Sequence, residues 1–209
     1  MSDPRKLFDI EKDPESASTI ICELFHAGKI FVYPTDTIYG IGGNPFDFGV
    51  VNRIAKLKGR QVKKQFIWLI SDTEKLINYV EITEDRQLEF LQKIWPGPVS
   101  VILNLNIRTK QITLQDTIAV RIPKNDFCLN LLKEISLPLI STSVNKSGEA
   151  PVNHVDQIIH NFANDMDAVF YHHGKIEEKS STIIDLTSKQ PKLIREGSIK
   201  FVELLRNFN

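Results

Sequence analysis

The residues that most clearly suggest chemistry lie in a short polar run, STSVNKSG at positions 141–148. This run follows the apolar segment LPLI, so hydroxyl and amide side chains are expected where a buried strand ends. Serine, threonine, asparagine and glycine are also common loop residues, and an ordinary solvated turn explains the run taken alone. The alternative is a site for a ligand made largely of oxygen atoms.

A second group of candidate residues is cationic. Five of the nine residues at positions 56–64 are lysine or arginine, and the apolar run FIWLI follows at 66–70. Basic residues complement the dipole at the end of a helix, which accounts for one or two of them. The group as a whole favours an anion site, in which Lys58 is a point charge and Arg60 a bidentate donor.

Several other chemistries lack their sequence motifs. There is no GxxxxGK[ST] phosphate loop, YGIGG does not match GxGxxG, and no GxSxG nucleophile motif is present. The five histidines show no metal-ligand spacing, so we expect no metal site. The two cysteines, Cys22 and Cys128, carry no motif of a nucleophile or a metal ligand.

The elements that must position these residues alternate between helix and strand. Asp13, Pro14 and Glu15 predict the start of a helix that Gly28 ends, and apolar spacing predicts further helices near 47–59, 88–95, 127–135 and 155–162. Strands are predicted at KIFVYPT, FIWLI, VSVILNL, IAVRIP, LPLIST, DAVFYHH and STIIDL. This order predicts one α/β domain over residues 1–209, with helices packed on a twisted, open, mixed sheet. Ligands of such sheets bind at strand ends, where the polar runs lie.

Composition limits the functional classes. The 26 basic and 26 acidic residues give zero net charge, which provides no overall attraction to nucleic acid. The N-terminus has no apolar leader, and no apolar run is long enough to span a membrane. Isolated cysteines are typical of a reducing compartment, so we expect a cytoplasmic protein.

Seven segments occur in the order found in one enzyme family. They are YPTDTIYGIGG, the K-x-R of Lys58 and Arg60, WPGPVSVIL, TIAVRIP, the S-x-N of Ser143 and Asn145, STIID and LIREG. The chain therefore resembles the YrdC-type threonylcarbamoyl-adenylate synthases, over about residues 14–205 and in their short, single-domain form. The resemblance implies a YrdC-like sheet with a concave basic face. It also implies a reaction in which L-threonine, bicarbonate and ATP, supplied with Mg²⁺, give threonylcarbamoyl-adenylate and pyrophosphate.

The resemblance also assigns roles to individual residues. Lys58 and Arg60 would be catalytic and would bind ATP. The other expected ATP-binding residues are Thr117, Ser143, Asn145 and Arg195, and those expected to bind threonine are Thr37, Arg121, Ser141 and Ser181. Arg121 is the natural partner of a substrate carboxylate.

The chain departs from the family pattern near the K-x-R. Gln61 and Gln65 stand where many members have proline and a small residue, and Leu69 lies near a position where some members have a histidine that contacts threonine. These departures bear on the threonine pocket. We also consider Lys64 as a further phosphate contact. In a related subfamily of the same fold the S-x-N motif is poorly preserved, whereas this chain has both Ser143 and Asn145.

Two other functions compete with the synthase. One is a non-catalytic module of the same fold that binds double-stranded RNA, tRNA or the ribosome; zero net charge and the lack of aromatic-rich basic stretches weigh against it. The other is carbamoyl transfer, as in larger proteins whose acylphosphatase-like and zinc-finger segments are missing here. As partners we expect small-molecule substrates, tRNA directly or through downstream threonylcarbamoyl-transferase proteins, and no membrane, with the protein a monomer.

Overall fold

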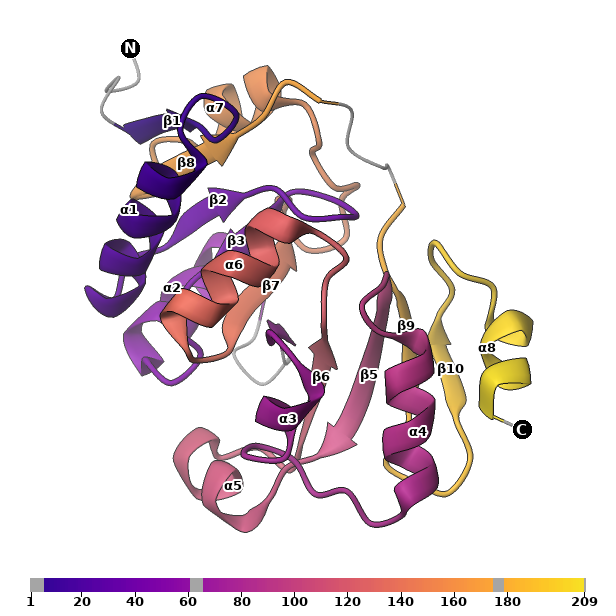
Figure 1. Cartoon of the computed structure of the whole chain (residues 1–209). Helices are drawn as coiled ribbons and strands as arrows, with labels where there is room; N and C mark the ends of the chain where they lie inside the picture. Colours follow the sequence, from indigo (N-terminus) through magenta and orange to yellow (C-terminus); the bar gives the residue numbers. More distant parts are fainter. Residues whose placement is uncertain (1–5, 61–65, 175–178, 209) are drawn as a thin grey trace.

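The computed structural model describes residues 6–60, 66–174 and 179–208. Within them one ten-stranded sheet has the order β1-β8-β2-β3-β7-β4-β6-β5-β9-β10 (Figure 1). The strands are β1 (Leu7–Asp9), β2 (Phe31–Tyr33), β3 (Gly40–Gly42), β4 (Ile67–Leu69), β5 (Val99–Asn104), β6 (Thr117–Arg121), β7 (Leu139–Ser143), β8 (Ala168–Tyr171), β9 (Thr182–Asp185) and β10 (Lys192–Arg195). The helices are α1 (Pro14–His26), α2 (Phe48–Leu57), α3 (Thr73–Leu76), α4 (Asp85–Ile94), α5 (Ile107–Thr113), α6 (Asp126–Ile135), α7 (Val155–Phe162) and α8 (Phe201–Phe208).

Strand β7 joins the two halves of the sheet. It pairs antiparallel with β3 on one side and with β4 on the other. The sheet is mixed: β4 with β6 and β5 with β9 are parallel pairs, whereas β5 with β6 is antiparallel. The predicted mixed, open α/β sheet is therefore confirmed.

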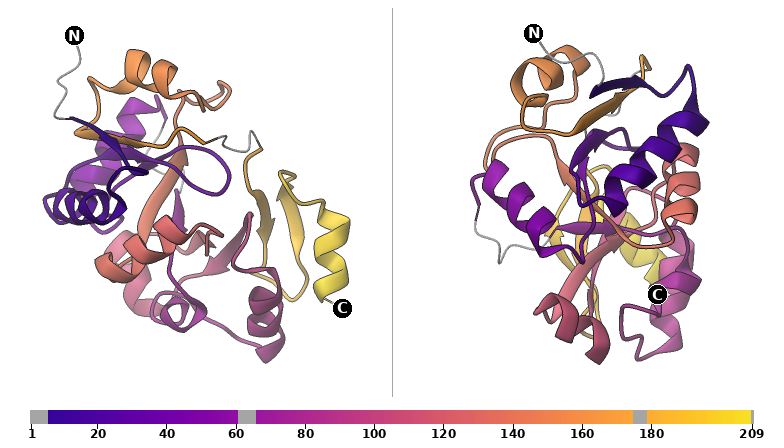
Figure 2. Two further views of the ribbon diagram at one scale, coloured as in Figure 1. Left: turned by 45° about the horizontal axis from the view of Figure 1, so that its top comes forward. Right: turned by 90° about the vertical axis from the view of Figure 1, so that its left-hand side faces the viewer.

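Helices cover the sheet in three apolar clusters. α1 and α6 pack on each other and on β2, β7 and β8; α2 and α7 contribute to a second cluster, and α4 and α8 to a third. The views in Figures 1 and 2 show α4 and α8 beside the half of the sheet that holds β5, β9 and β10, and α1 and α6 beside the other half. None of these helices is long and apolar enough to cross a membrane.

The local signals in the sequence explain the helix boundaries. Asp13 caps α1 by accepting from the backbone N–H of Ser16, and Gly28 adopts φ +66° just beyond the helix. Asp47 caps α2 in the same way, accepting from the backbone N–H groups of Gly49 and Val50. The elements that the pattern analysis missed are mostly short: β1, β3, α3, α5, β10 and α8.

Candidate active site

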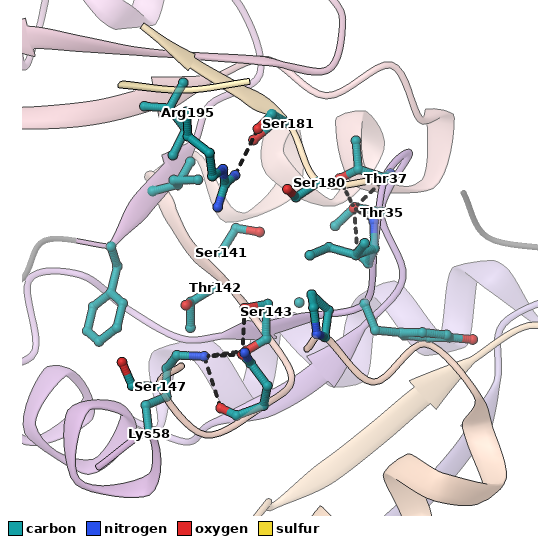
Figure 3. Close-up of a pocket in the computed structure, with 18 of the residues that line it drawn as sticks. Thr35, Thr37, Lys58, Ser141, Thr142, Ser143, Ser147, Ser180, Ser181 and Arg195 are labelled. Carbon is teal, nitrogen blue, oxygen red and sulfur yellow. Dashed lines mark hydrogen bonds between the residues drawn. The ribbon is translucent and has the colours of Figure 1, made fainter. Parts of the chain in front are cut away.

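A cavity of about 380 Å³ lies where the β2–β3 loop, the end of α2, the loop after β7 and the β9–β10 pair converge (Figure 3). This volume lies within the usual range for small-molecule sites. Its lining includes nine of the ten residues predicted for the site: Thr37, Lys58, Arg60, Arg121, Ser141, Ser143, Asn145, Ser181 and Arg195. Segments distant in sequence therefore meet at one place.

Thr117, the tenth predicted residue, does not line this cavity. It begins β6, where it pairs with Asn104 of β5. Residues two apart in a strand point to the same face, so Thr117 shares the face of Ala119 and Arg121. Its predicted contact with ATP remains a prediction.

The end of α2 presents the K-x-R residues. Lys58 is the C-cap, Gly59 has φ +61°, and the backbone N–H groups of Gly59 and Arg60 donate to the carbonyls of Lys56 and Ala55. This is a Schellman ending, which needs a left-handed residue and therefore favours glycine between the two cations. The turn brings both Lys58 and Arg60 to the cavity wall.

The Lys58 ammonium is buried against the loop that follows β7. Lys58 Nζ donates to Ser143 O at 2.6 Å, to Asn145 O at 3.1 Å and to Asn145 Oδ1 at 2.7 Å. Burial, and after it the nearby Arg60, lowers the pKa of Lys58 to about 8. Lys58 therefore holds the polar loop in shape, and it is close to losing its proton in mildly alkaline solution.

The polar loop after β7 is a hydrogen-bonded unit rather than a loose turn. Ser143 Oγ donates to Asn145 Oδ1 at 2.6 Å, and Asn145 Nδ2 donates to the carbonyl of Glu149 at 2.6 Å. The backbone N–H of Ser147 donates to the carbonyl of Lys58. Asn145 thus connects both ends of the loop to the helix end that carries Lys58.

Arg60 lies over the ring of Phe66, with Cζ 4.1 Å from the ring centroid. Such stacking orients a guanidinium plane. Burial lowers the pKa of Arg60 from its ordinary value, which leaves the side chain cationic. The arrangement presents an oriented positive charge at the same end of the cavity as Lys58.

The opposite end of the cavity is organised around Arg121, at the end of β6. Arg121 Nη1 donates to Thr37 Oγ1 at 3.1 Å and lies 3.3 Å from Asp36 Oδ1. Arg121 is only 3% exposed, so the Asp36 carboxylate balances a buried cation. Asp36 and Thr37 belong to the loop between β2 and β3.

The Thr37 hydroxyl has a defined hydrogen-bond direction. Thr35 Oγ1 donates to the carbonyl of Ile38 at 2.7 Å, so in its 3.1 Å contact with Thr37 Oγ1 it is Thr37 that donates. Thr37 also accepts from Arg121. A ligand group that reaches Thr37 must therefore donate a hydrogen bond to the remaining lone pair, as a hydroxyl or an amine does.

The β9–β10 side contributes Ser181 and Arg195. Ser181 Oγ is 2.9 Å from Ser100 Oγ of β5, and the carbonyl of Ser181 accepts from Arg195 Nη2 at 2.8 Å. Gly197 allows this close packing, because an added Cβ would lie 2.2 Å from the carbonyl oxygen of Ser180. The two strands thereby fix a hydroxyl and a guanidinium at the cavity wall.

Several neighbours of the predicted residues also shape the site. Asp36 contacts Arg121, and Ser100 contacts Ser181, each across a long stretch of sequence. Phe66 contacts Arg60, which lies close to it in the chain. All three lie in segments quoted above, Asp36 in PTDT, Ser100 in WPGPVSVIL and Phe66 in FIWLI, but only the fold shows which side chains they face. Among the departures, Leu69 is fully buried in the cluster of α1 and α6 and lies opposite Arg121 in register. Gln61, Lys64 and Gln65 fall outside the described residues.

The cavity has more basic than acidic side chains in its wall. Among the described residues of its lining four are basic and one, Glu149, is acidic, whereas the whole chain has zero net charge. Positive charge is thus concentrated in this cavity, as required for a polyanionic ligand.

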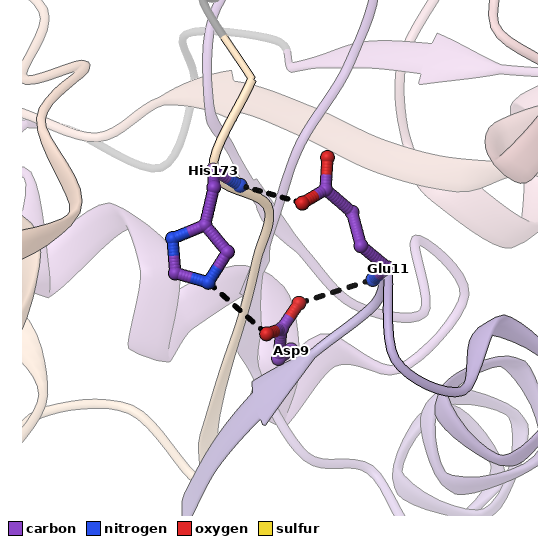
Figure 4. Close-up of side chains that lie close together, drawn as sticks. All are labelled: Asp9, Glu11 and His173. Carbon is purple, nitrogen blue, oxygen red and sulfur yellow. Dashed lines mark hydrogen bonds and ion pairs between the residues drawn. The ribbon is translucent and has the colours of Figure 1, made fainter.

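A separate titratable group lies at the ends of β1 and β8 (Figure 4). His173 Nε2 is 3.1 Å from Asp9 Oδ2, the backbone N–H of His173 donates to Glu11 Oε2, and that of Glu11 donates to Asp9 Oδ1. Sequence spacing did not reveal this group. Lys12 Nζ, 3.4 Å from Asp9 Oδ2, already places a cation beside it, and its internal hydrogen bonds account for its geometry.

Comparison with known proteins agrees with the fold. A threonylcarbamoyl-AMP synthase of Pyrococcus abyssi is 28% identical over 197 residues, which are 93% of this chain and 58% of that protein. The crystal structure of Pyrococcus abyssi Sua5 complexed with L-threonine has a TM-score of 0.84 at 28% identity, covering 92% of this chain and 57% of that one. YciO of Escherichia coli, at 23% identity, matches in fold over the full length of both chains, with a TM-score of 0.84.

The chain thus spans less than two thirds of the length of the Sua5 proteins that it matches. The family model Sua5_yciO_yrdC, described as "Telomere recombination", matches residues 23–197, which is most of the sequence. The same residues contain the K-x-R, S-x-N and PTDT segments whose side chains line the cavity. The chain therefore belongs to the Sua5/YciO/YrdC family.

Proposed function

We propose that this protein is an L-threonylcarbamoyladenylate synthase, which converts L-threonine, bicarbonate and ATP to threonylcarbamoyl-AMP and pyrophosphate. The observation that carries the proposal is the two-ended cavity. Figure 3 shows Lys58 and Ser143 on one side of the cavity and Thr37 and Ser181 on the other; Asn145 bonds Lys58, Arg60 follows it in the chain, and Arg121 bonds Thr37. One end suits a polyphosphate and the other an amino acid. The relative named threonylcarbamoyl-AMP synthase and the relative bound to L-threonine support the same reading.

The chemistry fits a site with many donors and few acids. The amine of threonine forms a C–N bond to the carbon of bicarbonate and water is lost, which yields a carbamate; a carbamate oxygen then attacks the α-phosphorus of ATP. The bond between the α-phosphorus and the bridging oxygen breaks, and pyrophosphate leaves with that electron pair. Because the nucleophile is already anionic, the protein mainly positions the reactants and stabilises negative charge.

The residues divide between the two substrates. Arg60 and Arg195 would contact phosphate oxygens, with Lys58 and Ser143 exchanging internal hydrogen bonds for phosphate contacts. Mg²⁺ would arrive with ATP, and Glu149 is the one carboxylate among the described residues of the lining, so phosphate oxygens and water would supply most of the ligands of the ion. Arg121 would hold the threonine carboxylate, and Thr37, Ser141 and Ser181 would line the pocket for the rest of the molecule.

The proposed product is an activated group donor. It would be used in threonylcarbamoylation of tRNA, through downstream threonylcarbamoyl-transferase proteins or by direct contact with tRNA, and we place this activity in the cytoplasm with the protein as a monomer. A non-catalytic RNA-binding module is the competing function.

Pyrophosphate release tests the proposal. The purified chain is incubated with Mg²⁺ and ATP, with and without threonine and bicarbonate. Release that requires both co-substrates supports the synthase. Release that ignores threonine, or tight RNA binding without any turnover, contradicts it.

A further inference from the structure

Asp36 stands behind Arg121 rather than in the cavity. Its side chain is 9% exposed and that of Arg121 is 4% exposed. Asp36 Oδ1 lies 3.3 Å from Arg121 Nη1, and Asp36 Oδ2 accepts from the backbone N–H of Lys124 at 3.1 Å. Arg121 lines the cavity, whereas Asp36 is not among its lining residues. The carboxylate therefore ties the β2–β3 loop to the chain that leaves β6, with the guanidinium between it and the cavity.

The atoms of the Arg121 guanidinium have unequal partners. Nη1 donates to Thr37 and forms an ion pair with Asp36 Oδ1 without a hydrogen bond, whereas the Nε donor is buried and has no acceptor among the described residues. A buried donor without an acceptor is unfavourable, and each such atom in a folded protein calls for an explanation. Because Nε itself is buried, a ligand in the cavity would meet another part of the guanidinium. A carboxylate is the acceptor that best matches a guanidinium edge.

We propose that Asp36 is the residue that positions Arg121 as a receptor for the carboxylate of an amino acid. The inference rests on the proposed function, which supplies an amino-acid substrate. The ion pair and the hydrogen bond to Thr37 fix the Nη1 end of the guanidinium, and with it the orientation in which Arg121 lines the cavity. Asp36 does not touch the ligand and acts through Arg121.

The same pair helps the cavity to sort its two anionic substrates. A polyphosphate is drawn to the strongest local positive charge, and the Asp36 carboxylate reduces the net charge at Arg121. A single carboxylate instead gains from the fixed geometry of a bidentate contact. Arg121 is thereby reserved for the amino acid, while Lys58 and Arg60 remain for the triphosphate.

The test compares L-threonine with L-threoninol, which carries a hydroxymethyl group in place of the carboxylate. Dissociation constants are measured by calorimetry for the wild type, Asp36→Ala and Asp36→Asn. Glu23→Gln, an exposed position on α1, controls for the loss of one negative charge. The wild type and Glu23→Gln should prefer threonine by about tenfold or more, as expected for a charge-assisted bidentate contact. Both Asp36 variants should lose most of this preference while threoninol binding stays within about twofold.

A double-mutant cycle completes the experiment. If Arg121 carries the effect, Asp36→Ala should change the threonine-to-threoninol ratio little when Arg121→Ala is already present. Thermal unfolding of each ligand-free variant verifies that it is folded, and Asp36→Asn, which keeps the side-chain volume, replaces Asp36→Ala if the alanine variant does not fold. A purely structural Asp36 would weaken both ligands equally and leave the ratio unchanged.

Two results would overturn the inference. One is an unchanged ratio in folded Asp36 variants. The other is tighter threonine binding in Asp36→Asn, because that result would mean that Asp36 only weakens the positive potential at Arg121. Neither depends on turnover. A wild-type protein that prefers threonine to threoninol but releases no threonine-dependent pyrophosphate would contradict the proposed function alone. A wild-type protein without that preference would contradict both the role of Arg121 as a carboxylate receptor and the positioning role of Asp36.

Discussion

Lys58 Nζ lies 2.7 Å from Asn145 Oδ1, and the two carbonyl contacts to Ser143 and Asn145 bring its hydrogen bonds to three. An ammonium has three N–H donors, so this lysine is saturated by the polar loop. It can contact a phosphate only by giving up one of these bonds. Ligand binding at this end of the cavity is therefore coupled to the shape of the loop after β7.

The first prediction concerns pH. The pKa of Lys58 is lowered to about 8, so the ammonium is charged at pH 7 and largely neutral at pH 9. ATP should bind more weakly as pH rises through 8, by up to about tenfold per pH unit if the proton is required. The ATP-induced rise in melting temperature, measured from pH 7 to 9.5, reports this change. In Lys58→Met the ATP-induced rise in melting temperature should vary less with pH.

Stability should respond to the same group in the opposite direction. The ordinary pKa of lysine is 10.5, and the folded value is lower, so between about pH 8 and 10.5 the unfolded chain binds more protons at Lys58. The contribution of this group to the free energy of unfolding therefore increases with pH in that window. The slope of the free energy of unfolding against pH is measured for the wild type and for Lys58→Met. The difference between the two slopes is the contribution of Lys58. A Lys58 contribution that falls with pH would contradict the lowered pKa.

The second prediction separates the two members of the S-x-N. Asn145→Ala removes an acceptor from the buried Lys58 and a donor to Glu149, so it should lower the free energy of unfolding by about 1–3 kcal/mol. Ser143→Ala removes one hydroxyl and should cost less than about 1.5 kcal/mol. Denaturant unfolding without ligand measures both values.

Both variants should also lose much of the stabilisation by ATP, because they alter the proposed phosphate end of the cavity. Lys146→Ala, at an exposed position in the same loop, is the matched control. If ATP raises the melting temperature of Ser143→Ala and Asn145→Ala as much as that of the wild type, the loop has a structural role and does not bind ATP.

The third prediction tests the stacked guanidinium. Arg60→Ala should reduce the rate of pyrophosphate release by an amount equivalent to about 2–4 kcal/mol of transition-state stabilisation, similar to the loss of an oxyanion donor. Arg60→Lys should recover only part of this, because lysine has neither the planar fork nor the stack on Phe66. Lys56→Ala, at an exposed position on α2, serves as a control in the same assay. Near-complete activity in Arg60→Ala would show that Arg60 is not the proposed phosphate contact.

The fold was largely predictable because its helices carry strong local signals, such as the caps at Asp13 and Asp47. Strand β3 was missed because its sequence, GIG, has weak strand propensity. Gly42 is there for space, since an added Cβ would lie 2.7 Å from the rings of both Phe31 and Tyr33. A packing requirement across two strands leaves no periodic pattern in the sequence.

Most of the residues predicted for the site line the cavity, but the contacts between their side chains were not predictable. The resemblance identified Arg121 and Ser181, yet nothing local shows that Asp36 faces Arg121 across 85 positions of sequence or that Ser100 faces Ser181. The internal partners of Lys58 were equally hidden, because two of the three are backbone carbonyls. Such contacts depend on how strands pair, which a single sequence specifies only weakly.

The last prediction concerns the choice of amino acid. The cavity offers a lone pair on Thr37 and a hydroxyl on Ser181 to a side-chain hydroxyl, and Ile67 and Ile183 line it as apolar residues. Serine lacks only the methyl group of threonine and should lose about 1–3 kcal/mol, so it should be a weak substrate. Valine keeps the shape but leaves the polar partners without a donor or acceptor, and it should be nearly inert. Bicarbonate-dependent pyrophosphate release with the three amino acids measures this order, and Arg121→Ala should abolish use of threonine. Valine turning over as fast as threonine would rule out recognition of the hydroxyl, and an active Arg121→Ala would remove the carboxylate anchor.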